Sequence, residues 1–422
     1  MEIRYHKLPE PAAGSAFPES GNEEKMKTYE LIAPCHFGLE AVLKREIDDL
    51  GYDISKVEDG RVTFIGDMEA ICRANVFLRS AERILLKVGS FTAYTFDELF
   101  EKTRALDWGA LIPEDGKCWV TKASSVKSKL FSTSDIQSIM KKAIVEKLKS
   151  TYKTEIIPET GAAYPLRVFA MKDEFTIGID TTGDSLHKRG YRQSTTKAPI
   201  SETLASALLL LTPWKGDRIL VDPFCGSGTF AIEAAMMAAN MAPGMNRSFL
   251  AEEWKNLIPR KLWYDTMDEA NDLVDLNIKT DIQGYDIDAS AVRMARENAE
   301  RAGVSGLIHL QQRPVSQLSH PGKYGFIVTN PPYGERLEEK EALPAIYRTL
   351  GKRFAALDTW SMYVITSYED AQKDLGRQAD RNRKIYNGMI KTYYYQYLGP
   401  RPPKNGRSAA ERIERTDRKT NP

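Results

Sequence analysis

The chain has 422 residues, of which 42% are hydrophobic and 28% charged, and its formal net charge at pH 7 is +1. Such a length predicts two or three domains, and such a composition is typical of a soluble globular protein rather than a disordered or fibrous one. No apolar run reaches the roughly 18 residues of a membrane span, and the first residues lack the apolar core of a signal peptide, so we expect a cytoplasmic protein.

Four cysteines, Cys35, Cys72, Cys118 and Cys225, lie far apart in the sequence, and no clustered His/Cys spacing accompanies them. This pattern predicts neither a zinc site nor a disulfide framework. We therefore expect free structural thiols in a reducing compartment and no bound metal.

Both ends of the chain have compositions typical of disorder. Residues 1–25 are rich in proline, glycine and acids, with few large apolar residues, and predict a disordered N-terminal tail. Met26, just before the first folded segment, is an alternative start. Residues 400–422 are rich in proline, arginine and lysine and predict a disordered basic tail.

The first folded segment has the pattern of a small α+β unit. Hydrophobic periodicity predicts a strand at 28–34, an amphipathic helix at 37–50, a hairpin around Asp59 and Gly60, a helix at 67–75 and a strand at 84–88. This order predicts a ferredoxin-like domain over residues 26–90.

A second α+β unit follows over residues 91–182. The pattern predicts a helix at 95–106, a strand at 117–124 and a hairpin at 166–180. Between them lies a helix that we expect to begin at a capping box formed by Ser134 and Gln137. Residues 117–153 contain nine lysines and two acids. Such a cluster is typical of a polyanion-binding surface, and a solvated helix face is the alternative.

A third unit begins with the polar, basic segment 183–192, which could contact a ligand. A predicted helix at 201–211 precedes an apolar strand that ends at Asp222 and continues into a loop with Gly226 and Gly228. The loop matches neither the phosphate-binding G-K-[ST] pattern nor G-x-G-x-x-G, which excludes a Rossmann-type dehydrogenase. An acid before the loop would repel pyrophosphate and suits a cofactor that carries an amine or a cation.

The next predicted strand ends at an acid. Asp286 ends a strand, where a carboxylate can accept hydrogen bonds from ribose hydroxyls, and Asp288 is expected to cap the next helix. The intervening insertion, residues 242–280, carries Trp254, Trp263 and Tyr264, which we expect to serve packing.

The stretch from Phe326 to Tyr333 (FIVTNPPY) predicts a buried strand that the two prolines end. The Asn330 amide and the Pro331 carbonyl would face a ligand, with the Tyr333 ring beside them. This cluster suits a flat base with an exocyclic amino group. The alternative is a strand followed by an ordinary proline turn.

Three motifs in this order carry a family resemblance: Asp222 to Thr229 (DPFCGSGT), Gly284 to Asp288 (GYDID) and Asn330 to Arg336 (NPPYGER). Together they resemble the class I S-adenosylmethionine-dependent methyltransferases that modify amines. The segment LHKRGYR at 186–192 and Trp254 are narrower and resemble the THUMP-domain RNA guanine-N2 methyltransferases of the ribosomal large-subunit type.

The resemblance implies a Rossmann-like methyltransferase domain over residues 183–399, preceded by the ferredoxin-like domain and by a THUMP RNA-binding domain over 91–182. It implies S-adenosyl-L-methionine as cofactor, ribosomal RNA as partner, and no metal; no obligate protein partner is evident. The implied cofactor-binding residues are Asp222, Pro223, Gly226, Gly228, Thr229, Asp286, Val315 and Asn330. The implied catalytic residues are Asn330, Pro331 and Tyr333. The RNA contacts predicted from the lysine cluster and the basic linker are Lys127, Lys129, Lys141, Lys142, Arg189 and Arg192.

One residue departs from the family pattern. Where such enzymes carry an acid for the adenine amine, this chain has Pro314, so we expect adenine to contact the backbone or Val315 instead. Three alternatives stay open at this point: a tRNA guanosine-N2 methyltransferase, a DNA adenine-N6 methyltransferase, and a non-catalytic RNA-binding protein with a relic methyltransferase domain.

Overall fold

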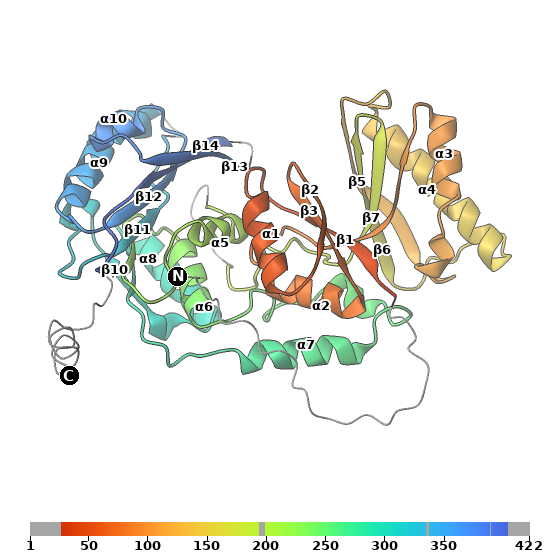
Figure 1. The fold of residues 1–422 in the computed structure, drawn as a ribbon, viewed down its shortest axis with the longest axis horizontal. Helices are drawn as coiled ribbons and strands as arrows, with labels where there is room; N and C mark the ends of the chain where they lie inside the picture. The colour runs from red at the N-terminus through yellow and green to blue at the C-terminus, as the bar shows by residue number, and fades with distance from the viewer. Residues whose placement is uncertain (1–26, 194–198, 335–336, 389, 404–422) are drawn as a thin grey trace, which may run out of the picture.

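The computed structural model describes residues 27–193, 199–334, 337–388 and 390–403, and of residues 337–339 it describes the backbone alone. The predicted N-terminal tail, Met26 and most of the predicted C-terminal tail lie outside these residues. Two seven-stranded sheets organise the chain, one in each half of the molecule (Figure 1). The four cysteines are free and buried, as predicted.

The N-terminal sheet has the order β2-β3-β1-β4-β7-β6-β5. Its strands are β1 (Tyr29–Pro34), β2 (Ile54–Glu58), β3 (Arg61–Gly66), β4 (Leu85–Thr92), β5 (Lys117–Val126), β6 (Ala163–Met171) and β7 (Glu174–Asp180). Its helices are α1 (Glu40–Asp49), α2 (Met68–Phe77), α3 (Phe96–Arg104) and α4 (Thr133–Tyr152).

The two predicted α+β units share this one sheet. Leu86 of β4 pairs with Leu31 of β1 on one side and with Ile179 of β7 on the other. The predicted boundary between residues 90 and 91 lies within β4. The edge strand of the first unit is thus covered by the second, which removes an exposed edge that would invite aggregation.

The capping-box prediction for α4 is wrong by two residues. Ser132 caps the helix and accepts the backbone N–H of Asp135 at 3.4 Å, whereas Gln137 donates its side-chain amide to the Val120 carbonyl at 2.9 Å. One stripe of α4, formed by Ile136, Met140, Ile144 and Leu148, is fully buried against the sheet.

The second sheet has the order β10-β9-β8-β11-β12-β14-β13. Its first five strands are parallel, and β14 pairs antiparallel with both β12 and β13. Its strands are β8 (Leu220–Asp222), β9 (Ile282–Asp286), β10 (Ile308–Gln312), β11 (Phe326–Thr329), β12 (Ser361–Thr366), β13 (Arg381–Asn387) and β14 (Ile390–Tyr397). This mixed α/β architecture, with two α+β units before it, has the layers of the predicted fold class.

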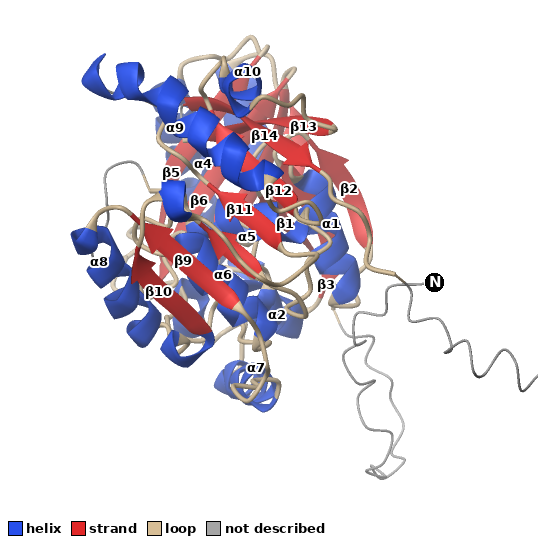
Figure 2. Cartoon of the chain, turned by 90° about the vertical axis from the view of Figure 1, so that its left-hand side faces the viewer, coloured by secondary structure: helices blue, strands red, loops and turns tan. Residues whose placement is uncertain are grey.

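Helices cover both faces of the second sheet (Figure 2). One face packs against α5 (Glu202–Leu210), α6 (Thr229–Ala238) and α8 (Ala289–Arg301). The other packs against α9 (Leu337–Ala355) and α10 (Ala371–Leu375). Burial on both faces explains why β8 and β11 are continuous apolar runs instead of alternating ones.

The insertion between β8 and β9 ties the two halves together. Its helix α7 (Arg260–Asp272) runs beside α2, where Arg73 makes a two-pronged hydrogen bond to Glu269 at 2.8 and 3.0 Å (Figure 1). Trp254 is buried and stacks on Tyr164 of β6 with ring centroids 4.8 Å apart. The predicted packing role of Trp254 is confirmed, but Tyr264 is 63% exposed.

Within the described ranges, no helix is long and apolar enough to cross a membrane. The same residues contain no group of three or more His, Cys, Asp or Glu side chains arranged to hold a metal ion.

Candidate active site

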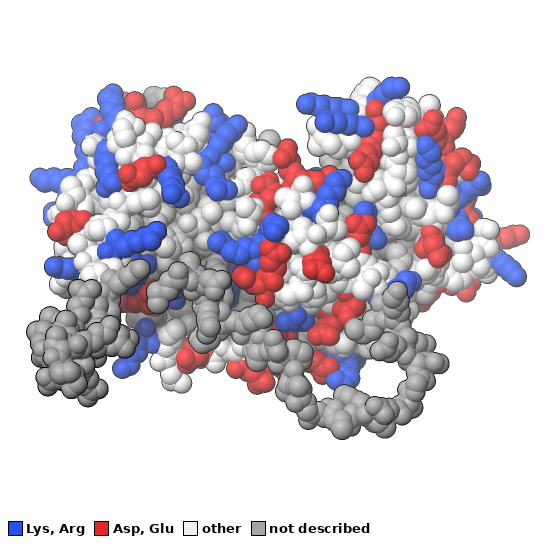
Figure 3. Space-filling model, in the orientation of Figure 1, with Lys and Arg blue, Asp and Glu red and all other residues white. Residues whose placement is uncertain are grey.

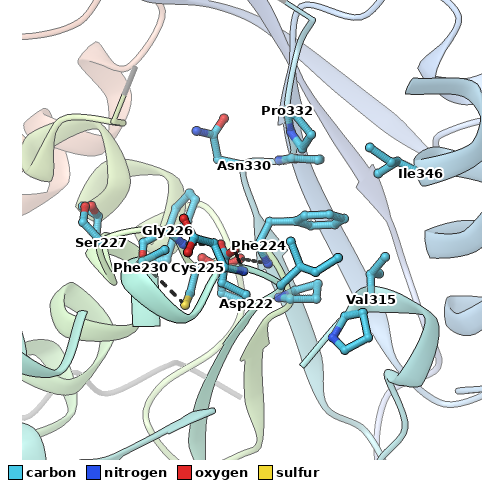
Figure 4. Close-up of a pocket in the computed structure, with 18 of the residues that line it drawn as sticks. Asp222, Phe224, Cys225, Gly226, Ser227, Phe230, Val315, Asn330, Pro332 and Ile346 are labelled. Carbon is cyan, nitrogen blue, oxygen red and sulfur yellow. Dashed lines mark hydrogen bonds between the residues drawn. The ribbon is translucent and has the colours of Figure 1, made fainter. Parts of the chain in front are cut away.

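A cavity of about 940 Å³ opens where β8, β9 and β11 end (Figure 4). Carboxyl ends of parallel strands are the usual place for a ligand site in such a sheet. The cavity is lined by nine of the predicted site residues: Asp222, Pro223, Gly226, Thr229, Asp286, Val315, Asn330, Pro331 and Tyr333. Gly228 does not line it.

Asp222, the last residue of β8, lies at the floor of this cavity and is 1% exposed. Its Oδ1 accepts the Thr329 hydroxyl at 2.6 Å and the Phe224 N–H at 3.1 Å. Burial, together with the nearby charge of Asp286, raises the pKa of Asp222 to about 7, although these two hydrogen bonds lower it. A positively charged ligand would stabilise the ionised form of such a buried carboxylate.

Asp286, the last residue of β9, is held in one orientation by two backbone donors. Its Oδ2 accepts the Gly226 N–H at 2.9 Å, and its Oδ1 accepts the Asp288 N–H at 3.0 Å. Burial raises the pKa of this carboxyl as well. Asp288 caps α8 by accepting the Ser290 N–H at 2.8 Å, which confirms its predicted role.

The glycine loop has two separate tasks. Gly226 lines the cavity and binds Asp286, whereas Gly228 begins α6 with φ +87°. A Cβ at Gly228 would lie 3.0 Å from the Cβ of Ala295 on α8. Gly228 therefore serves the left-handed turn and the close approach of two helices, a different role from the predicted cofactor contact.

The proline turn after β11 presents its polar groups to the cavity. The Tyr333 hydroxyl donates to Asn330 Oδ1. Tyr347 of α9 supports the turn from behind, because its hydroxyl donates to the Pro332 carbonyl at 3.3 Å and lies 2.6 Å from Thr366 Oγ1. The turn is thus fixed from two sides, which favours a site over an ordinary strand end.

The other end of the cavity is apolar and suits a flat ring. Val315 and Pro314, both in the segment after β10, line it together with Ile287, which is 72% exposed. A ligand that covers this large exposed aliphatic side chain would remove its apolar surface from water, which favours binding. The Ser316 side chain adds a hydroxyl to the same wall.

Sequence reasoning missed several residues of the lining: Phe224, Ile287, Ser316 and Ile346. Ile287 carried a usable signal, because it stands between two acids at a strand end. Ile346 carried none, since it comes from α9 and reaches the cavity only in the folded chain (Figure 4).

Two predicted RNA contacts of the linker are wrong. Arg189 is 2% exposed, donates to the carbonyls of Arg79 and Leu186 at 2.6 and 2.8 Å, and lies 3.7 Å from Glu233. Arg192 pairs with Glu202 at 3.1 Å and donates to Thr229 Oγ1 at 2.6 Å, so it braces the start of α6.

The lysine cluster divides into bound and available side chains. The Lys141 ammonium is held by Glu159 and the Cys118 carbonyl, and its contact with RNA stays a prediction. Lys127, Lys129 and Lys142 are exposed and stay predictions. Lys129 lies over the Tyr94 ring, 4.6 Å from its centroid.

A parallel sheet with an antiparallel end, a glycine loop after its first strand, a fixed acid after the next and an Asn-Pro-Pro-Tyr turn after β11 define a class I methyltransferase. Three family models match the chain in the order of its units: "RlmL ferredoxin-like domain" over residues 30–85, "THUMP domain" over 93–180, and "RMKL-like, methyltransferase domain" over 189–396.

Curated relatives extend the match along most of the chain. The chain is 50% identical over 374 residues to the "Putative RNA methyltransferase YpsC" of Bacillus subtilis (strain 168), covering 88% of this chain and 96% of that one. It is 33% identical over 375 residues to the "Ribosomal RNA large subunit methyltransferase K/L" of Methylococcus capsulatus, covering 86% of this chain but only 50% of that one. The chain belongs to the RMKL-like methyltransferase family.

Solved structures agree with this assignment. A "possible methylase" from Clostridium difficile 630 is 52% identical with a TM-score of 0.87, covering 90% of this chain and all of its own. A Listeria monocytogenes protein titled a "predicted N6-adenine-specific DNA methylase" is 47% identical with a TM-score of 0.84, covering 89% and 97%. SMU.472, titled "a putative methyltransferase complexed with SAH", is 44% identical with a TM-score of 0.84, covering 89% of this chain and 99% of that one.

The cofactor is therefore S-adenosyl-L-methionine, and the cavity fits it. Two carboxylates lie at the ends of neighbouring strands, the buried one suited to positive charge and the oriented one to hydroxyl groups. The apolar wall around Ile287 and Val315 suits a purine ring.

Proposed function

We propose that this chain transfers the methyl group of S-adenosyl-L-methionine to the exocyclic N2 amine of a guanosine in large-subunit ribosomal RNA, in the cytoplasm. The observation that carries the proposal is the placement of Asn330 and Pro331 in the same cavity as Asp222 and Asp286. Groups that suit an amine and groups that suit the cofactor thus line the same cavity.

The acceptor groups of the turn suit an exocyclic amine. A carboxamide oxygen has two lone pairs, so Asn330 Oδ1 can accept an amine N–H while it still accepts the Tyr333 hydroxyl. A second acceptor, the Pro331 carbonyl, would fix the amine so that its nitrogen lone pair points along the cavity. The same two dipoles stabilise the positive charge that develops on nitrogen during transfer.

The cofactor supplies an already activated methyl group, so the chain need contribute chiefly orientation and a favourable field. Asp222 would face the methionine part of the cofactor, and Asp286 would hold its ribose. Phe224 and Ile346 line the cavity with apolar side chains and would exclude water around the reacting amine.

RNA as the substrate class is supported by the names of the two curated relatives and by the THUMP match. Exposed lysines on the THUMP unit, Lys127, Lys129 and Lys142, suit a phosphate backbone. The chain spans about half of the K/L relative, so the large-subunit target is carried over from part of a larger protein. Guanine N2 rests on the motif resemblance.

Methylation of RNA by tritium-labelled cofactor tests the proposal. Total RNA and DNA from a strain that lacks the gene are incubated with the enzyme, the RNA is separated by size, and modified nucleosides are identified by mass spectrometry. We expect N2-methylguanosine in large-subunit RNA alone. N2-methylguanosine confined to tRNA, or N6-methyladenine in DNA, would replace the target by one of the alternatives.

Cofactor calorimetry separates an enzyme from a relic. The proposal requires S-adenosylmethionine to bind, and to bind more weakly when Asp286 is replaced by alanine. No heat of binding with either protein would support a non-catalytic RNA-binding protein.

A further inference from the structure

The β13–β14 hairpin presents a mixed basic and aromatic surface that the site does not include. Strand register pairs Lys384 with Tyr393 and Tyr386 with Lys391. Since directly paired residues, and residues two apart in one strand, share a face of a sheet, these four side chains form a checkerboard on one face. We call these four residues the hairpin platform.

The rings and ammonium groups of the platform are in contact. The Lys384 ammonium lies 5.3 Å from the Tyr386 ring centroid, and the Lys391 ammonium lies 5.1 Å from that of Tyr393. Both lysines are exposed, and both tyrosines are partly exposed. Glu369 is an acid near Lys391. The two lysines give the four platform residues a positive net charge.

The opposite face of the hairpin anchors it. Ile385 and Thr392 are fully buried, and Arg383 donates to the Gly38 carbonyl of the N-terminal half at 2.6 Å. The hairpin is therefore fixed on its inner face, and only the platform face is available to a ligand. A fixed surface loses little entropy when it binds.

The platform lies close to the substrate end of the active site. Tyr393 pairs with Thr366, the last residue of β12, and so marks the carboxyl edge of the sheet where the cavity opens. Thr366 contacts the Tyr347 hydroxyl, which in turn donates to the Pro332 carbonyl of the Asn330–Tyr333 turn. Figure 3 shows basic side chains over the ends of β13 and β14.

We propose that the hairpin platform binds the unpaired RNA strand next to the target nucleotide, with Lys384 and Lys391 on phosphates and Tyr386 and Tyr393 under bases. This inference rests on the proposed function, because it takes RNA as the substrate. A base inside a helix must leave its stack to enter the cavity. Aromatic rings beside a cavity stabilise the neighbouring bases that lose their stacking partner, and interspersed lysines hold the backbone.

The test measures RNA binding and methylation by full-length variants. The probe is a fluorescein-labelled single-stranded RNA of about 12 mixed-sequence nucleotides, and methylation uses the RNA that the wild-type enzyme modifies. We expect Lys384→Ala with Lys391→Ala to weaken binding of the probe about tenfold and to lower the slope of log affinity against log salt by about 1.4, which is two single-strand contacts. The KM for RNA should rise by a similar factor while kcat stays within about twofold.

The tyrosines are tested at Tyr386. Tyr386→Ala should weaken probe binding about tenfold, whereas Tyr386→Phe, which keeps the ring, should bind like the wild type. Matched controls lie on α7: Tyr264→Ala removes a tyrosine that is 63% exposed, and Lys261→Ala removes an exposed lysine. Neither control should change binding, and all variants should keep the wild-type affinity for S-adenosylmethionine.

The outcomes separate this inference from the proposed function. If the wild type methylates RNA and the platform variants bind and react like the α7 controls, the platform is an ordinary surface and the inference fails. If the wild type neither binds nor methylates RNA, the proposed function has failed instead. Equal loss with the labelled single strand and with its duplex would overturn the claim that the platform recognises an unpaired strand.

Discussion

Thr329 and Asp222, the last residues of the neighbouring strands β11 and β8, are joined by a hydrogen bond of 2.6 Å from the threonine hydroxyl to the carboxylate. One bond thus connects the strand that precedes the amine-binding turn to the strand that precedes the cofactor loop. Both groups are buried, so the bond fixes the separation of the two halves of the site without competition from water.

Replacing Thr329 by valine tests this connection. The variant keeps the shape of the side chain but leaves a buried carboxylate with one partner fewer, so the free energy of unfolding should fall by about 1–3 kcal/mol. Because this hydrogen bond lowers the pKa of Asp222, its loss should raise that pKa further. Urea denaturation and cofactor titration at two pH values measure both effects. An unchanged stability would mean that the bond contributes nothing.

Asp222 gives the protein a predicted pH dependence. Its folded-state pKa is raised to about 7 from the ordinary carboxyl value of 3.8, so the folded state binds more protons than the unfolded chain between these two pH values. The stability of the cofactor-free protein should therefore be greatest at low pH with respect to this group and fall by about 1 kcal/mol per pH unit up to roughly pH 7. Denaturation of the wild type and of Asp222→Asn should differ in this slope.

Cofactor affinity should have the opposite pH dependence. The ionised form of Asp222 attracts a positively charged ligand, so the Kd for S-adenosylmethionine should fall about fivefold or more between roughly pH 6 and pH 8. The affinity of Asp222→Asn should be weaker and nearly flat over this range. A wild-type profile identical in shape to that of the variant would remove Asp222 from the cofactor site.

The two acids at the end of β9, Asp286 and Asp288, should respond differently to removal. Asp286→Ala deletes the acceptor that holds the Gly226 N–H and faces the cavity, so the Kd for the cofactor should rise about 30-fold or more. Asp288→Ala removes a helix cap, so the free energy of unfolding should fall by about 1 kcal/mol with less than a threefold change in Kd. Calorimetry on both variants decides between the assignments, and a reversed order would exchange them.

Buried and exposed basic residues should lose different properties when they are replaced: the buried one stability, the exposed ones affinity for RNA. Arg189→Ala leaves the buried Glu233 without its nearest guanidinium, so it should cost about 3–5 kcal/mol of stability. Lys127→Ala with Lys129→Ala should leave stability unchanged and weaken RNA binding, with a lower salt slope. Thermal melting and RNA titration distinguish them. A stable Arg189→Ala protein with selectively weakened RNA binding would restore the original prediction for that residue.

Local patterns were enough to predict much of the fold and the roles of the two acids at the end of β9. Asp286 and Asp288 could be assigned because strand ends and helix caps depend on neighbours in the sequence. Apart from the capping box of α4, what sequence reasoning missed involves distant partners. Glu159 neutralises Lys141 from outside its helix, Glu233 lies 44 residues beyond Arg189, and Ile346 enters the cavity from α9. No local periodicity indicates such pairings.

That the two N-terminal units share one sheet was missed for the same reason, because the pairing joins strands that are distant in the sequence. The strand at 84–88 was predicted, but its continuation to Thr92 depends on pairing with β7, which follows more than 80 residues later. Gly228 is a related case. Its motif indicated a ligand, whereas the structure uses its missing side chain against Ala295. A glycine in a loop shows that space is needed and does not show what fills it.

Methyl transfer by Asn330→Ala tests the central claim most directly. Asn330 lies in the cavity beside the turn that Tyr347 supports, and its carboxamide oxygen is the proposed acceptor of the target amine. With saturating RNA and labelled cofactor, kcat should fall by a factor of about 100 or more, while the Kd for S-adenosylmethionine stays within about threefold of the wild type. Retained methyl transfer, or loss of transfer only through loss of cofactor binding, would contradict the assignment of Asn330 to the amine.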